Sequence, residues 1–397
     1  MKNIFYVSSV CSEQKFASLF KECKVKPQQQ AQKFHSLLVK GLEQLGHQVS
    51  VMSSLPINAG SIDKFWIGFK KENEENVHYT YLPFTRLPII KHLLIFVFGF
   101  LTCLVWSLKR KNKVLICDVL NISSSVSALI VAKLFRYKSV AIVTDLPGYM
   151  IQYSQQKGVK SHILHLYAKV CNYLIKKYDR YLILTEQMNE IVNPMNKPYV
   201  VIEGMVDSRM IDIDNDLDHK HGEKVILYAG ALFEVYGVKK LLEAFMKTNH
   251  KDAQLWLFGS GELVDEIRRY EKLDNRIRYF GVVPNADVVM EERRATLLVN
   301  PRATEEEFTK YSFPSKNMEY MVSGTPVITT RLPGMPMEYN EYVYLIEDES
   351  ETGFRETFEK TLSLDKKELH AQGAKAKAFV MKNKNNILQA SKLSKIL

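Results

Sequence analysis

The sequence predicts an α/β fold organised as two domains. The chain has 397 residues, enough for two or three domains, and its 46% content of hydrophobic residues leaves no room for extensive disorder. In the first half, short apolar strands alternate with helical patterns, which is typical of a parallel sheet. In the second half, residues 311–328 form a tight loop, a short helix and a buried strand in that order.

Five strands and one long helix are predicted in the first half. The helix runs from Gln28 to Leu45 and stops at Gly46. The loop before it, Ser8–Pro27, contains no glycine, which excludes a dinucleotide-binding fingerprint. Because this loop faces the carboxyl ends of the strands, we expect ligand contacts in it. The predicted strands are 4–7, 47–52, 114–117, 139–143 and 181–184.

Asp145 follows the apolar strand 139–143 at its carboxyl end. A carboxylate at that edge of a parallel sheet is placed to bind a ligand hydroxyl. The alternative is that Asp145 caps the turn that begins at Leu146 and Pro147, and the sequence leaves both possibilities open.

The segment 311–328 predicts an anion site. Residues 313–314, Phe-Pro, stiffen the loop, Ser315 is placed to cap the helix, and Lys316 adds a positive charge to the first turn, where unpaired N–H groups point outward. A diphosphate fits such a site. Glu319 lies one turn further on the same face, where its carboxylate can accept from a ribose hydroxyl. Considered alone, the segment also fits an ordinary connection between a helix and a strand.

Four further segments precede this one in a characteristic order, and together they resemble the C-terminal half of family-4 glycosyltransferases over most of residues 200–330. The resemblance implies the GT-B fold, in which two Rossmann-like domains face each other across a cleft, and retaining transfer from a nucleotide-sugar. The segments are the strand 225–232, the turn and helix 236–245, the strand and glycine turn 254–261, and the strand 277–281.

The resemblance also implies roles for residues and segments. We expect an acceptor-binding domain over 1–205, a nucleotide-sugar-binding domain over 206–374, and a C-terminal helix over 375–397 that returns to the first domain. Asp145, Lys316 and Arg302 are the catalytic candidates. The donor-binding candidates are Gly230, Ala231, Gly259, Lys310, Tyr311, Phe313, Pro314, Ser315, Glu307 and Glu319.

Three positions depart from the family pattern. The family's arginine and lysine that reach the donor diphosphate correspond to Ala231 and Tyr236, and the first of its paired glutamates corresponds to Tyr311. The chain also carries about six extra residues in 302–310. We interpret this as relocation: Arg302, Lys310 and Lys316 neutralise the diphosphate, and Glu307 replaces the missing glutamate. The alternative is a solvated surface loop, which suits Glu305 and Glu306 better than Arg302.

Charge and one apolar run suggest a partner surface. A net charge of +10 favours an anionic surface, and we expect a membrane rather than nucleic acid because no nucleic-acid-binding motif accompanies the charge. Residues 92–108 are apolar and precede the basic cluster 109–113. As a helix, these residues span ~26 Å, short of a ~30 Å bilayer core. They form either a core helix or, as we favour, an element lying in the membrane interface, with 161–181 as a second candidate.

The expected protein is a metal-independent, retaining hexosyltransferase without a cofactor. It acts on a saccharide or lipid-linked acceptor in cell-surface polysaccharide or capsule synthesis, at the inner face of the membrane. Two alternatives are an inactive transferase-like partner subunit and a GT-B nucleotide-sugar epimerase. The acidic run 212–218 is expected to be an exposed linker rather than a metal site. The five scattered cysteines indicate a reducing compartment, and Met1 begins a strand without a signal-peptide pattern.

Overall fold

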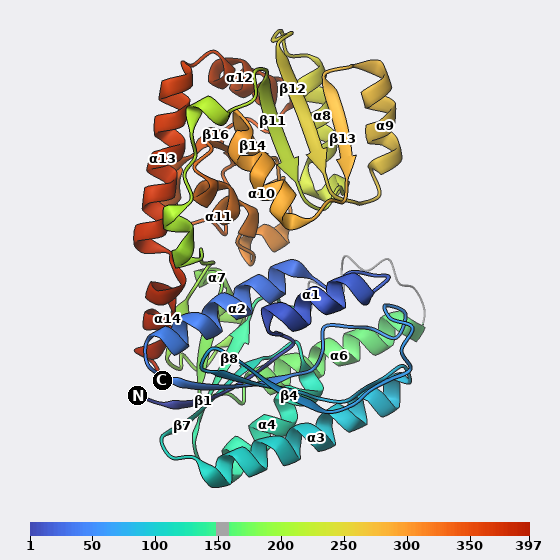
Figure 1. The fold of residues 1–397 in the computed structure, drawn as a ribbon, viewed down its shortest axis with the longest axis vertical. Helices are drawn as coiled ribbons and strands as arrows, with labels where there is room; N and C mark the ends of the chain where they lie inside the picture. The colour runs from blue at the N-terminus through green and yellow to red at the C-terminus, as the bar shows by residue number, and fades with distance from the viewer. Residues whose placement is uncertain (148–158) are drawn as a thin grey trace. The chain divides into compact units, whose positions relative to one another are not determined.

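The computed structural model describes residues 1–147 and 159–397, and the chain forms two compact units. The first unit comprises Met1–Met205 and Asn386–Leu397, and the second comprises Val206–Asn385. Each unit is built on a mostly parallel sheet with helices packed on it (Figure 1). The predicted α/β fold is therefore confirmed.

The sheet of the first unit has the strand order β10-β9-β8-β7-β1-β2-β5-β4, in which β4 pairs with β5 antiparallel and the other neighbours pair in parallel. All five predicted strands are present, as β1, β2, β7, β8 and β9. The strands are β1 (Asn3–Ser8), β2 (Gln48–Ser53), β4 (Lys70–Glu74), β5 (Val77–Tyr81), β7 (Lys113–Asp118), β8 (Lys138–Val143), β9 (Arg180–Ile183) and β10 (Tyr199–Val201), with β3 (Trp66–Ile67) and β6 (Phe84–Thr85) paired separately. The helices are α1 (Glu13–Glu22), α2 (Gln29–Gln44), α3 (Pro88–Lys109), α4 (Ile122–Leu134), α6 (Val159–Ile175), α7 (Glu186–Val192) and α14 (Asn386–Ser394).

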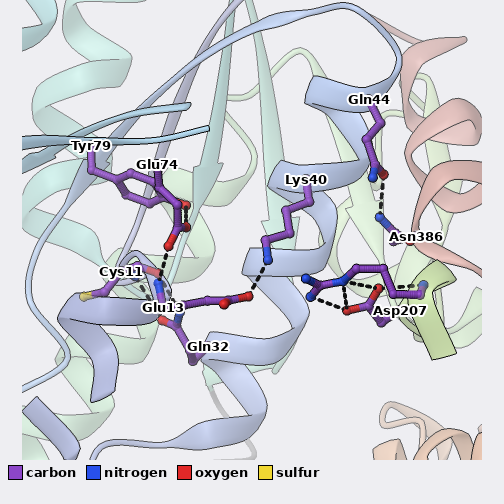
Figure 2. Close-up of polar contacts among 10 residues, drawn as sticks. Cys11, Glu13, Gln32, Lys40, Gln44, Glu74, Tyr79, Asp207 and Asn386 are labelled. Carbon is purple, nitrogen blue, oxygen red and sulfur yellow. Dashed lines mark hydrogen bonds and ion pairs between the residues drawn. The ribbon is translucent and has the colours of Figure 1, made fainter. Parts of the chain in front are cut away.

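The segment predicted as a long loop, Ser8–Pro27, contains helix α1. Ser12 caps it, because its hydroxyl accepts from the Lys15 N–H at 3.1 Å. Figure 2 shows how the start of α1 is held: the Glu13 N–H donates to Glu74 at 2.8 Å, and the Glu13 carboxylate pairs with Lys40. The expectation of an open loop is therefore wrong, and the cap at Ser12 is the sequence signal that it missed.

Helix α3 is longer than the predicted apolar run 92–108. It begins at Pro88, whose fixed φ suits the first turn of a helix. Its 22 residues extend ~33 Å, so α3 is long and apolar enough to cross a bilayer by length and composition, and the length argument against crossing fails. Only 17% of the most apolar 18-residue stretch of α3 is buried, whereas a core helix would be mostly buried. The buried residues of α3 are Ile95, Gly99, Cys103 and Ser107, of which Gly99 and Cys103 contact α4.

The second unit has a parallel sheet with the order β13-β12-β11-β14-β15-β16. Its strands are β11 (Lys224–Ala229), β12 (Ala253–Phe258), β13 (Ile277–Gly281), β14 (Leu297–Asn300), β15 (Val327–Thr330) and β16 (Tyr344–Ile346). Its helices are α8 (Val238–Met246), α9 (Val264–Leu273), α10 (Asn285–Arg294), α11 (Ser315–Ser323), α12 (Glu351–Leu362) and α13 (Lys366–Asn383). The helix–strand alternation predicted over 225–281 is confirmed.

The acidic run 212–218 is attached to the second unit, contrary to the expectation of a linker. The Asn215 side chain donates to the Ser323 carbonyl at 2.8 Å and to the Thr325 hydroxyl at 2.9 Å, and the Lys377 ammonium donates to the Ile213 carbonyl. The carboxylates of the run still face solvent. These backbone and amide contacts fix the segment, whereas its charge pattern alone suggested an exposed linker.

The C-terminal segment divides between the units at Asn386, whereas the prediction placed a single returning helix over 375–397. Helix α13 belongs to the second unit, and α14 belongs to the first, where it packs on α2. Ala390 and Leu393 are fully buried there. The two points at which the chain passes between units lie side by side, because the Val206 N–H donates to the Lys384 carbonyl at 3.0 Å.

The contact between α14 and α2 predicts a mutant effect. A Cβ on Gly41 would lie 2.3 Å from the Asn386 carbonyl oxygen and 2.8 Å from the Ala390 Cβ. Alanine normally favours a helix by ~1 kcal/mol over glycine, but overpacking costs ~1–3 kcal/mol, so we expect Gly41→Ala to lower the melting temperature. Gly60→Ala is the control, because a Cβ there meets nothing within 4 Å. Equal melting of the two variants would show that α14 does not dock on α2.

Candidate functional site

Two glycine turns form the carboxyl edge of the second sheet, after β11 and β12. Gly230 and Gly259 have φ angles of 155° and 127°, a region that side chains rarely adopt. A Cβ on Gly259 would lie 1.8 Å from the Gly230 carbonyl oxygen, so the two turns meet backbone to backbone. Ala231 follows, and its carbonyl accepts from the Tyr228 hydroxyl at 2.8 Å. The two glycines singled out in the sequence therefore lie together at the carboxyl edge of the sheet, where the backbone is closely packed.

Lys316 reaches this edge from the first turn of α11. Its ammonium donates to the Tyr228 hydroxyl at 2.9 Å and lies 4.0 Å from the centre of that ring. A Cβ on Gly230 would lie 1.6 Å from the Lys316 Nζ. Burial of the ammonium, with a smaller effect from Arg302, lowers the pKa of Lys316 to about 7, against an opposing attraction to Glu319. The structure thus brings Lys316, Gly230, Arg302 and Glu319 into one neighbourhood.

Buried contacts fix α11 in this position. The Tyr320 hydroxyl accepts from the Ala229 N–H at 2.9 Å, which ties the helix to the end of β11. The buried side chains of Asn300 and Asn317 are hydrogen bonded at 2.8 Å. Sequence reasoning missed Tyr320 and Tyr228, although Tyr320 directly follows the candidate Glu319.

The start of α11 differs in one detail from the prediction. Pro314 is the N-cap of α11. Ser315 is the first residue of the helix and its side chain is exposed, so the capping role predicted for Ser315 is wrong. Phe313 is buried against the ring of Tyr339 at a centroid distance of 5.3 Å. The Phe-Pro pair therefore anchors the loop by packing.

Arg302 lies beside Tyr236, where the family pattern has a lysine. Its guanidinium carbon lies 4.9 Å from the centre of the Tyr236 ring and 5.3 Å from that of Phe308. Its backbone carbonyl accepts from the Thr330 hydroxyl at 2.6 Å, and one guanidinium nitrogen lies 3.4 Å from the Ser312 hydroxyl. A cation from the extra segment is therefore held next to the position that lost one.

The extra segment 302–310 has an ordered backbone, while part of its charge faces solvent. The Thr304 N–H donates to Glu349 at 3.1 Å, and the hydroxyl of the buried Thr309, within the 3-10 helix Glu307–Lys310, donates to the Glu306 carbonyl at 2.6 Å. Glu307 and Lys310 are exposed, and Tyr311, which follows them, is half-buried. The segment thus combines the two predicted behaviours: an anchored Arg302 and a solvated acidic rim.

Asp145 belongs to the first unit and the other candidates to the second. It is exposed, two residues beyond β8. The same edge carries a buried cluster that the sequence did not reveal: the Tyr6 hydroxyl is 2.6 Å from the His35 Nδ1, and the His35 Nε2 is 3.4 Å from Asp118. Among the described residues, no group of three or more His, Cys, Asp or Glu side chains is arranged to hold a metal ion.

The position of Lys316 predicts how an anion binds. We expect Lys316→Ala to weaken nucleoside diphosphate binding by ~1.5–3 kcal/mol in a folded protein, because a charge-assisted contact is lost. Bound diphosphate raises the pKa of Lys316 above about 7 by pairing with its charged form. Affinity is therefore highest below pH 7 and falls as the pH rises, since binding must then take up a proton.

Calorimetric titration with UDP between pH 6 and 9 measures both effects. The fall in affinity should disappear in Lys316→Ala, and Gly60→Ala should retain it. An unchanged dissociation constant in Lys316→Ala would refute the assignment, as would an unchanged pH dependence.

Comparison with known proteins agrees with this geometry. Residues 210–379 match the family described as Glycosyl transferases group 1. No curated protein sequence matches the chain. Similar solved structures include sucrose-phosphate synthase from Thermosynechococcus elongatus, at 14% identity and a TM-score of 0.69, covering 100% of this chain and 98% of that one. They also include HepE from Anabaena in complex with UDP and glucose, at 12% identity and a TM-score of 0.63, covering 100% and 99%.

A third similar structure is the apo form of the lipopolysaccharide outer core galactosyltransferase WaaB, at 14% identity and a TM-score of 0.60, covering 100% of this chain and 99% of that one. At these identities the likeness shows the fold alone, and it confirms GT-B. Residues 210–379, which lie in the second unit, therefore match a Glycosyl transferases group 1 domain, and the whole chain has the GT-B fold.

Proposed function

We propose that the protein is a retaining glycosyltransferase that moves a sugar from a nucleotide-sugar to a saccharide or lipid-linked acceptor in cell-surface polysaccharide synthesis. The proposal rests on the positions of two cations. Lys316, in the first turn of α11, lies against the Gly230 turn, and Arg302 is near enough to lower the pKa of Lys316. Cations and helix N–H groups gathered at one sheet edge suit a diphosphate. The group 1 match and the UDP in the HepE structure support this choice of ligand.

The chemistry assigned to these residues is electrostatic. As the glycosidic bond of the donor breaks, its electron pair moves to the diphosphate, which gains charge. Lys316, Arg302 and the first N–H groups of α11 stabilise that charge in the transition state. The acceptor hydroxyl attacks on the face that the diphosphate leaves, so no protein nucleophile is assigned and the proposal requires no metal. Glu319 takes the ribose contact, and Asp145 binds an acceptor or sugar hydroxyl.

The alternative is an inactive partner subunit. It is suggested by Ala231, Tyr236 and Tyr311, which stand where the family pattern has an arginine, a lysine and a glutamate. The geometry favours activity, because Arg302 stacks on Tyr236 and so brings a cation to the altered position. A chain that had lost its donor site would gain nothing by holding two cations together at the sheet edge, where each disfavours the other.

Membrane association is proposed from the first unit. It carries 28 Lys and Arg against 13 Asp and Glu, a net charge of +15, whereas the second unit carries 26 against 31, a net charge of −5. Helix α3 adds an apolar stripe of exposed side chains and ends beside the basic cluster 109–113. An apolar stripe next to a basic cluster is typical of a helix lying at the headgroups of an anionic inner leaflet. The stripe comprises Ile89, Leu93, Val97, Leu101, Val105 and Leu108.

The test of the enzyme is donor turnover with and without a membrane extract. We expect sugar from one nucleotide-sugar of a panel to enter the lipid fraction only when the extract is present, and Lys316→Ala to slow transfer about a hundredfold. Nuclear magnetic resonance of the product should show the anomeric configuration of the donor. No turnover with any donor would support the inactive subunit, and conversion without extract would support the epimerase.

The test of the membrane surface is co-sedimentation with vesicles. We expect binding to phosphatidylcholine vesicles that contain phosphatidylglycerol, partial release by salt as the cluster is screened, and weaker binding of the pair Lys109→Ala and Lys111→Ala. The pair Lys366→Ala and Lys367→Ala removes the same charge from the second unit and should change little. Binding that ignores lipid charge and salt would contradict this surface.

A further inference from the structure

A groove of about 920 Å³ lies between α4 and α6 in the first unit. Its wall is apolar along both helices, and several of its large apolar side chains face solvent. Leu134, Tyr173 and Met195 are 65%, 61% and 61% exposed. Single exposed apolar residues are common on proteins, but here they converge on one hollow. The lining residues are Val126, Leu129, Ile130, Lys133, Leu134, Tyr173, Leu174, Lys176, Lys177, Met195 and Lys197.

Four lysines border this apolar groove, and two of them, Lys133 and Lys197, are engaged in contacts within the protein. Lys133 pairs with Asp179 at 2.9 Å, and Lys197 donates to the carbonyls of Lys176 and Tyr178 at 2.8 and 2.6 Å. Lys176 and Lys177 are exposed at the rim, and the Lys177 ammonium lies 4.3 Å from the centre of the Tyr173 ring. The rim is therefore cationic while the floor is hydrocarbon.

The lysine rim of the groove lies toward the edge of the sheet opposite the candidate site residues of the first unit. Helix α4 connects the parallel strands β7 and β8, so it runs back from the carboxyl edge, where Asp118 and Asp145 lie, to the amino edge. Its 13 residues extend ~20 Å. Lys133, Lys176 and Lys177 precede β8 and β9 and hence lie toward the amino edge. An occupant of the groove would not present a hydroxyl to the reaction.

We propose that the groove binds one membrane lipid with a phosphate headgroup. The acyl chain lies along Leu129, Ile130 and Leu174, and the phosphate contacts Lys176 and Lys177. Charge complementarity selects this occupant, because the apolar floor suits a hydrocarbon chain and the lysine rim suits an anion. The proposal goes beyond general attraction to an anionic surface: it assigns a saturable site for a lipid that is not a substrate.

The test uses dihexanoyl phosphatidylglycerol below its micelle concentration, measured by calorimetric titration against the full chain. We expect saturable binding of one molecule, and a loss of about fivefold for each lysine removed in Lys176→Ala and Lys177→Ala. Leu134→Gln, on the exposed apolar wall, should also weaken binding without unfolding the protein. Glycerol phosphate and dihexanoyl phosphatidylcholine should bind much more weakly, since the first has no acyl chain and the second has no net negative charge.

The pair Lys109→Ala and Lys111→Ala is the matched control, with the same charge change outside the groove. It should weaken vesicle binding yet leave the short-chain lipid unaffected. Equal loss in both pairs would overturn the proposal in favour of general attraction, as would the absence of saturable binding. A dimer that forms through the groove and is broken by Leu134→Gln would show that a second copy of the chain is the occupant. Donor turnover is measured separately, so failure here leaves the proposed function untouched.

Discussion

The candidate site of the second unit is built around a lysine ammonium held against a glycine turn. Lys316 reaches Gly230 so closely that the turn admits no side chain, and the cation rests on Tyr228 within the influence of Arg302. Burial and the like charge of Arg302 both disfavour the charged form of Lys316 and lower its pKa. Holding a cation in such a place costs free energy, and groups with perturbed pKa values cluster at functional sites, which is the basis of the anion site proposed above. The tyrosine and asparagine contacts of α11 hold it in place.

The departures from the family pattern become understandable at this level. Tyr236 replaces a charged side chain, yet its ring provides a face on which Arg302 lies. The arginine comes from a later part of the chain, and Thr330 and Glu349 anchor the backbone that carries it. Tyr236 therefore lacks the positive charge of the family pattern, but the Arg302 guanidinium lies next to it in the folded chain. A comparison of motifs alone does not detect the arginine that lies next to the altered position.

The sequence predicted the strands well because buried parallel strands are short apolar runs, and every predicted strand is present. It predicted helices poorly where their start depends on one residue: Ser12 caps α1, and Pro88 begins α3. Three residues that the sequence singled out, Gly230, Lys316 and Arg302, do lie near one another in the structure. Tyr228 and the Tyr6–His35–Asp118 cluster escaped because they depend on contacts between segments distant in sequence.

The return of α14 to the first unit has a consequence for synthesis on the ribosome. Residues 1–205 emerge first, but the face of α2 that receives Ala390 and Leu393 stays uncovered until residues 386–397 have been made. The second unit is continuous in sequence and becomes available to fold while the first is still incomplete. The apolar surfaces of α2 and α3 are then both exposed in the nascent chain, a state in which chaperones protect against aggregation. Completion of the first unit therefore waits until residues 386–397 have been synthesised.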